Sequence, residues 1–198
     1  MDHENIVTQT QRWVSEFVVK YYMCPFARAE VERNSIKYHV SNSDDMEKVI
    51  LMMIDVCQEL DQNTEIETSL LILPEGFDDF EVFLDLLAIA DEILIQQGYE
   101  GTYQLASFHP DYQFGGDTLE DPANYTNRAP YPTLHLLRES SIERVLRHYP
   151  SPEQIPERNV EFCRRKGSEW LETNLARCRE QIESSPTNSC EKLVTSET

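Results

Sequence analysis

The sequence has few basic residues and no long hydrophobic run. It holds 17 lysines and arginines against 36 aspartates and glutamates, which gives a formal net charge of −19. Such a surface repels phosphate backbones and anionic lipid, so we expect neither nucleic acid nor a membrane surface as a partner. The longest apolar stretch, "VFLDLLAIADEILI" (82–95), is interrupted by three acidic residues. It falls short of the roughly 18 apolar residues that a membrane-spanning helix requires.

The N-terminus lacks the pattern of a secretory signal, because Asp2 and Glu4 stand where a basic region would be. The five cysteines include no CxxC pair and no metal-finger spacing. We therefore expect a cytoplasmic protein with free thiols. Cys57, Cys163 and Cys178 lie in helical patterns and are expected to be small core residues.

The apolar periodicity predicts a single α/β domain. A helix over 4–23 is followed by alternating strands and helices, with strands over 35–41, 68–74 and 102–108, helices after Ser43–Asp44 and over about 78–97, and a candidate fourth strand over 133–139. This order favours a small three- to four-stranded sheet, mainly parallel or mixed, packed with helices.

The C-terminal part is expected to be helical and then disordered. Ser140 and Glu143 form a capping-box pattern for a helix, and Pro152 and Pro156 suit the start of one final helix that reaches Ile182. From residue 184 onward the chain is polar, so we expect a domain over 1–183 and a disordered tail over 184–198.

The stretch "SFHPDYQFGGD" (107–117) begins where the third strand ends. Ligands of open α/β sheets gather outside the carboxyl ends of strands, so this stretch is a candidate site. The connection over 109–132 is too long to be a simple link, and its aromatic residues, Tyr112 among them, predict an ordered loop that packs against something.

Three residues are candidates for catalysis. His109, followed two residues later by Asp111, suits general acid or base work, although a structural histidine is an equal alternative. Cys24 follows a helix and precedes Arg28, a setting that can favour a thiolate, although a lone cysteine is more often a packed residue.

Other residues are candidates for binding a substrate. Asn127 and Arg128 stand in a proline-flanked turn that can present donors to a carboxylate or phosphate. Tyr112 lies in the stretch 107–117, and Arg28 follows Cys24 by four residues. His135 and Arg138 lie on the expected fourth strand. The alternative role of His135 is a structural hydrogen bond, and that of Arg138 is an ion pair with Glu139.

Four blocks carry a resemblance to a known family: "MCPFA" (23–27), "SFHPDYQFGG" (107–116), "DPANYTNRAPYPTLHLLRE" (121–139) and "IPERN" (155–159). The chain resembles the bacterial domain of unknown function 1415 from about residue 10 to 180. It departs from the family pattern at "KYYM" before the cysteine and at Ala129, where serine is common. The resemblance implies that Cys24, His109, Asp111, Asn127 and Arg128 lie in the family's hallmark blocks, and it implies no particular reaction or cofactor.

The leading hypothesis is a small enzyme that acts on an anionic small molecule. Asn127 and Arg128 would hold the anion, His109 would transfer a proton, and Cys24 would be the nucleophile. One alternative is a zinc- or iron-binding protein that uses His109, Asp111, His135 and Cys24, and another is a monothiol redox protein. A third is a binding or scaffold protein without catalysis.

Overall fold

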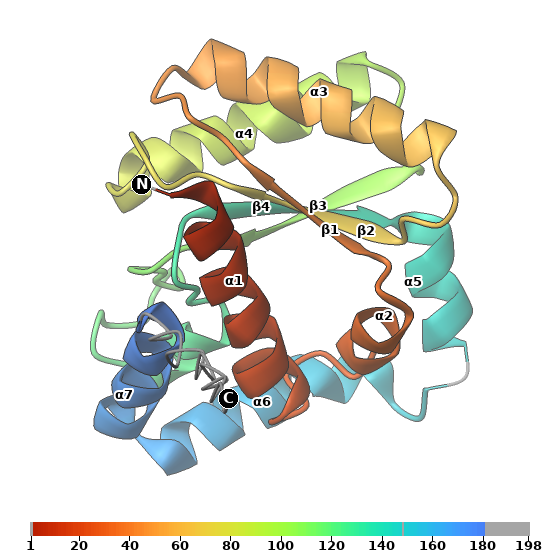
Figure 1. Ribbon diagram of the computed structural model, residues 1–198. Helices are drawn as coiled ribbons and strands as arrows, with labels where there is room; N and C mark the ends of the chain where they lie inside the picture. Colours follow the sequence, from red (N-terminus) through yellow and green to blue (C-terminus); the bar gives the residue numbers. More distant parts are fainter. Residues whose placement is uncertain (1, 148, 181–198) are drawn as a thin grey trace, which may run out of the picture.

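The computed structural model describes residues 2–147 and 149–180, which form one α/β domain (Figure 1). Its sheet has the strand order β1-β2-β4-β3. The strands are β1 (Ile36–Val40), β2 (Thr68–Ile72), β3 (Tyr103–Phe108) and β4 (Thr133–Arg138). β1 and β2 are parallel, whereas β4 is antiparallel to both of its neighbours, β2 and β3. The sheet is therefore mixed, and the expected α/β fold is confirmed.

Helices cover both faces of this sheet (Figure 1). The α3/α4 layer consists of α3 (Met46–Gln62) and α4 (Phe80–Gln96). The opposite α1/α6 layer contains α1 (His3–Trp13), the π-helical segment η1 (Val14–Val19), α2 (Ala27–Arg33), α6 (Ile155–Lys166) and α7 (Ser168–Arg179). The remaining elements are α5 (Glu139–Leu146), directly after β4, and the short 3-10 helices η2 (Pro122–Thr126) and η3 (Pro152–Gln154).

Two hydrophobic cores lie on the two faces of the sheet. Leu71 of β2 packs with the α3/α4 layer, whereas its neighbour Leu70 packs with Trp13 and Phe17 of the α1/α6 layer. This separation follows from the alternation of side chains along a strand. All five residues of β2 are buried, as expected for a strand covered on both faces.

Helix ends differ from the sequence-based expectation in three places. α3 is capped by Asp45, whose carboxylate accepts from the Glu47 N–H, because Ser43 instead caps the turn before it. α5 begins at Glu139, before the proposed capping box, so Ser140 already lies inside the helix. The expected single C-terminal helix is two helices, because Gly167, at φ +80°, ends α6 and α7 begins at the next residue.

The N-terminal helix continues past Trp13 as η1 and ends at Val19, four residues short of the expected boundary. Ile182 and the expected disordered tail over 184–198 lie outside the described residues. Within 2–147 and 149–180, none of the helices combines the length and the apolar character needed to cross a membrane.

Gly76 provides a test of the packing between the loops that follow β1 and β2. A Cβ at Gly76 would lie 2.5 Å from the Cα of Asp44, and the residue has φ +84°. We expect Gly76→Ala to lower the free energy of unfolding by about 1 kcal/mol for the backbone strain and by about 1–3 kcal/mol more for the clash. Gly98→Ala is the matched control, because Gly98 has φ +82° and no heavy atom within 4 Å of its Cβ position. If urea unfolding shows that Gly76→Ala and Gly98→Ala lower the free energy of unfolding equally, the close contact between Gly76 and Asp44 is contradicted.

Candidate functional site

A half-open groove of about 580 Å³ lies between the α1/α6 layer and the long loop after β3. Its lining is mainly apolar and comes from η1, the turn after η1, β3, the loop and α6. The residues that can supply chemistry or polar contacts are Cys24, Asp117, Asn127, Asn159 and Arg164. Apolar walls with a few converging polar groups are typical of a small-molecule site. We call this site the Cys24 groove.

The turn that carries Cys24 is attached to α6 by two side chains. The guanidinium of Arg158 donates to the Tyr22 carbonyl at 2.5 Å, and the Asn159 amide donates to the Met23 carbonyl at 2.7 Å. Both donors belong to the "IPERN" block. The block therefore positions Cys24, a role that sequence reasoning missed because the partners are 136 residues apart.

The Cys24 thiol is partly buried, and its burial raises its pKa above the ordinary value. The backbone N–H groups of Phe26 and Ala27 and the charge of Arg158 lower the pKa, but they do not offset the burial. Cys24 is therefore a thiol at neutral pH, with groups around it that would stabilise a thiolate once formed.

Asn127 joins the opposite wall of the groove to the end of β3. Its carbonyl accepts from the His109 N–H at 3.1 Å, and its side-chain amide donates to the Ser107 carbonyl at 3.2 Å. Its Oδ1 accepts from the Thr126 hydroxyl. The structure thus brings Cys24 and Asn127 to one groove, whereas His109 and Arg128, the other members of the hypothetical site, do not line it.

His109 lies on the other side of the sheet and is fully buried. It stacks against Phe80 and Phe83 of α4. Its Nε2 donates to the Phe77 carbonyl at 2.9 Å, and its Nδ1 accepts from the Asp111 N–H at 3.0 Å. Burial lowers the His109 pKa, so the ring is neutral. Both ring nitrogens are occupied, and the ring does not face Cys24.

Asp111 is exposed, and it orients His109 through its backbone N–H. Tyr112 packs against the rings of Phe80 and Phe114. Arg28 is exposed, with its guanidinium 5.5 Å from the centre of the Tyr22 ring, close to the turn that precedes Cys24.

Arg128 and Asn124 hold the loop itself. Arg128 stacks on Tyr125 at 4.5 Å and donates to the carbonyls of Tyr112 and Leu119. The fully buried Asn124, which sequence reasoning missed, accepts from the Phe114 N–H and donates to the Thr118 and Leu119 carbonyls. The sequence feature that could have indicated this role is the position of Asn124 two residues after Pro122, at the start of the stretch "NYTN" (124–127).

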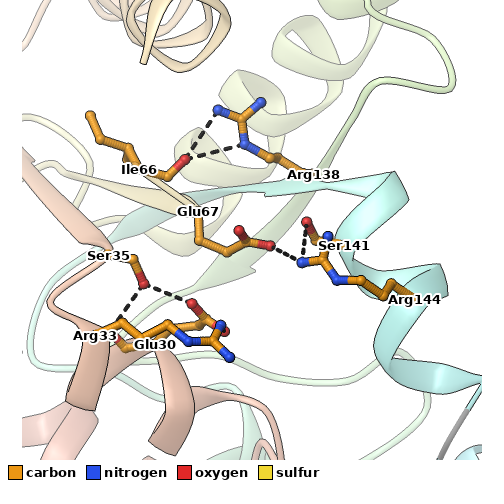
Figure 2. A network of polar contacts seen from close by, with 8 residues as sticks. All are labelled: Glu30, Arg33, Ser35, Ile66, Glu67, Arg138, Ser141 and Arg144. Carbon is orange, nitrogen blue, oxygen red and sulfur yellow. Dashed lines mark hydrogen bonds and ion pairs between the residues drawn. The ribbon is translucent and has the colours of Figure 1, made fainter. Parts of the chain in front are cut away.

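Arg138 lies at the far end of β4, away from the groove. Figure 2 shows its guanidinium directed at the Ile66 carbonyl, to which it donates two hydrogen bonds. The same view shows Glu67 paired with Arg144 of α5. Arg138 therefore holds the loop between α3 and β2 in place by hydrogen bonds to its main-chain carbonyls.

Within the part of the chain that the structure describes, no three His, Cys, Asp or Glu side chains are grouped as a metal site. In particular, His109 belongs to the α3/α4 side, whereas Cys24 lines a groove on the opposite side. His135, on β4, pairs with Leu70, whose side chain belongs to the α1/α6 core. The four ligands of the metal hypothesis are thus divided between the two faces of the sheet.

The fold and the groove define a single-domain α/β protein with a largely apolar groove in which Cys24 lies. The sequence profile of the family described as "Protein of unknown function (DUF1415)" matches residues 5–173, so the chain belongs to this family. No curated protein and no solved structure matched the chain.

Asn124 allows a test of the loop. Asn124→Ala would leave the buried Phe114 N–H without its partner and would remove one of the two donors to each of the Thr118 and Leu119 carbonyls, so we expect the free energy of unfolding to fall by about 2–3 kcal/mol. Gln113→Ala is the control in the same loop, because Gln113 is exposed and donates one hydrogen bond; its effect should stay within about 0.5 kcal/mol. Urea unfolding measures both, and a loss for Asn124→Ala no larger than that of the control would contradict the assigned role.

His135 allows a test of burial by pH. Burial lowers its pKa from 6.5 to about 4. As the pH falls, the imidazole of His135 is therefore protonated in the unfolded chain before it is protonated in the folded protein. The stability that comes from keeping this ring neutral is complete above pH 6.5 and is lost as the pH falls toward 4. Between pH 7 and pH 5, we expect the unfolding free energy of wild type to fall by about 2 kcal/mol more than that of His135→Gln. Parallel pH profiles in urea unfolding would contradict this.

Proposed function

We propose that the protein is a small cytoplasmic enzyme that acts on an anionic small molecule in the Cys24 groove. The observation that carries the proposal is the position of the Cys24 thiol, in the wall of a mainly apolar groove, where the charge of Arg158 lowers its pKa in opposition to burial. The four cysteines of the described residues are all free thiols, which supports a reducing compartment.

The contacts suggest a role for each residue. Arg158 donates to neutral partners, namely Tyr22, Tyr149 and Asn159, so its charge is not matched by a carboxylate among these contacts. It provides positive charge that acts on the thiol in an otherwise acidic protein, and the exposed Arg28 lies against the Tyr22 ring of the same turn. An anionic substrate would be attracted to this end, and Cys24 would act as the nucleophile.

No proton transfer is assigned to His109, because both of its ring nitrogens are hydrogen-bonded away from the groove. Arg128 and Arg138 are likewise engaged with main-chain carbonyls. Neither arginine lines the groove. The proposed site therefore consists of Cys24, Asn127 and Asn159, which line the groove, together with Arg158 and Arg28 beside the turn that carries Cys24.

A binding protein without catalysis is the second candidate. The raised pKa of Cys24 favours it, because a thiol is a much weaker nucleophile than a thiolate. Turnover of anionic metabolites by wild type, lost in Cys24→Ala, would support the enzyme. A ligand-dependent thermal shift without turnover, retained in Cys24→Ala, would support the binding protein.

Alkylation of Cys24 tests the local charge. In a Cys190→Ser background, we expect the rate with iodoacetate relative to iodoacetamide to be about threefold higher for Cys24 in the folded protein than in urea. Cys57, Cys163 and Cys178 are buried and should react only after unfolding. Mass spectrometry of the Cys24 peptide gives both rates.

Arg158→Gln should lower this iodoacetate preference, whereas Arg147→Gln, an exposed arginine of the chain paired with Glu143, should not. A preference for iodoacetamide in the folded protein, as the overall charge of −19 would produce, would contradict an anion site at Cys24.

A further inference from the structure

The Gly-Gly pair of the long loop forms a tight turn in the wall of the Cys24 groove. The Asp117 N–H donates to the Phe114 carbonyl at 3.1 Å, and Gly116 between them has φ +91°. A hydrogen bond from the fourth residue to the first, with glycine at positive φ in the third position, is typical of a type II β-turn. Such a turn brings its first and last Cα atoms within about 7 Å of each other. These two residues, Phe114 and Asp117, both line the groove.

The rest of the loop holds both ends of this turn in place. The Phe114 N–H donates to the Oδ1 of the buried Asn124 at 3.0 Å, and the Gln113 amide donates to the Asp117 carbonyl at 2.6 Å. The Tyr112 ring packs edge-on against the Phe114 ring, with 5.0 Å between their centres. The turn is therefore preorganised, and a ligand that binds to it need not order the loop.

The carboxylate of Asp117 has a charge that the protein does not match. Arg164, which also lines the groove, donates through two nitrogens to Asp121 at 2.8 and 3.1 Å. Asp121, by its hydrogen bonds and its charge, and Asp117, by its charge, raise the pKa of Arg164. Among the described residues, however, the Asp117 carboxylate has no hydrogen-bond or ion-pair partner of its own. One guanidinium thus lies near two carboxylates, which leaves an excess of negative charge beside the turn.

α6 separates this turn from Cys24. The Asn159 amide donates to the carbonyl of Met23, the residue before Cys24, whereas Arg164 lies close to Asp117. Five residues of an α-helix span about 7.5 Å along its axis. The thiol and the Asp117 carboxylate therefore lie toward different ends of the groove, with mainly apolar side chains between them.

A carboxylate without a partner, next to an aromatic ring in an apolar groove, suits an organic cation. The carboxylate pairs with an ammonium group, and the face of the ring attracts the same positive charge. The apolar walls, Phe108 and Val160 among them, contact the hydrocarbon part of such a ligand.

We propose that the turn Phe114–Asp117 is the subsite of the Cys24 groove for an organic ammonium group, which pairs with the Asp117 carboxylate and packs against the Phe114 ring. The ligand class is an amine with an apolar body that lies along α6. The inference rests on the groove being the binding site proposed above, and it deepens that proposal by naming the substrate class. A substrate whose anionic group is attracted to the Cys24 end carries a positive charge at its other end.

Two fluorinated probes test the subsite without any turnover. 4-Fluorobenzylamine carries an ammonium group at pH 7, and 4-fluorobenzyl alcohol has nearly the same shape without the charge. In 19F NMR titrations of the wild-type protein at low salt, we expect the Kd of the amine to be about fivefold lower than that of the alcohol. This factor is the size expected for a partly exposed ion pair beside an aromatic ring.

Three variants assign the preference to the turn. Asp117→Asn should reduce it to less than about twofold, because the amide keeps the size of the side chain and loses its charge. Glu120→Gln is the matched control and should keep the preference, since Glu120 is an exposed carboxylate of the same loop that does not line the groove. Phe114→Leu should weaken the binding of both probes, which a charge contact outside the groove would not explain. Thermal unfolding of Asp117→Asn and Glu120→Gln should match wild type.

Equal dissociation constants of the amine and the alcohol in wild type would overturn the inference, and so would an equal loss of the preference in Asp117→Asn and Glu120→Gln. If neither probe binds, the groove is not a ligand site, and the proposed function fails together with the inference. If the amine preference is absent while the iodoacetate preference of Cys24 is present, only the ammonium subsite is rejected. The reverse pattern rejects the anion end and supports the ammonium subsite.

Discussion

Two hydrogen bonds from α6 to the chain before Cys24 hold the walls of the groove together. Arg158 and Asn159 donate to the carbonyls of Tyr22 and Met23, which would otherwise have no partner at the end of η1. Tyr22 adopts φ +58°, a conformation that costs a non-glycine residue about 1 kcal/mol. The two hydrogen bonds from α6 offset that strain, so the position of Cys24 depends on a helix from the other end of the chain.

A second contact joins α6 to the loop that forms the opposite wall. Arg164 donates through two nitrogens to Asp121, which also caps η2 through the Ala123 N–H. The guanidinium and this N–H lower the pKa of Asp121, in keeping with a charge-assisted pair. α6 therefore contacts both walls, and the shape of the groove is set by one helix, whereas the surface pair itself contributes little to overall stability.

The sequence predicted the α/β fold because each strand and helix has a strong local apolar pattern. β2, with its continuous run of apolar residues, is the clearest case. Helix caps were predicted less well, since Ser43, Asp44 and Asp45 can all cap a helix and only the surrounding turn selects Asp45. The break at Gly167 was missed because glycine is tolerated inside helical patterns, and the residues on both sides keep the same periodicity.

The candidate site was predicted in part, and the reason lies at the end of β3. Phe108 faces the groove, and His109, one residue later, faces the α3/α4 layer. A sequence shows that the two residues alternate, but it does not show which of the two faces will carry a groove when both are covered by helices. His135, a candidate for substrate binding on the sequence alone, faces the α1/α6 layer because it pairs with Ala106, two residues before Phe108.

The arginines explain why an acidic protein of this kind still has a candidate anion site. Arg128 and Arg138 donate to main-chain carbonyls in the long loop and between α3 and β2, and Arg12 donates to the carbonyls of Arg177 and Glu180. Arg128 and Arg138 thus stabilise loops and Arg12 caps the C-terminal end of α7, uses for which five fixed donors are well suited. Arg158 does the same for the turn before Cys24, and it differs from the other three in that its charge acts on the Cys24 thiol, whose pKa it lowers. The same side chain therefore fixes the turn that carries the thiol and provides the positive charge on which the proposed anion site depends.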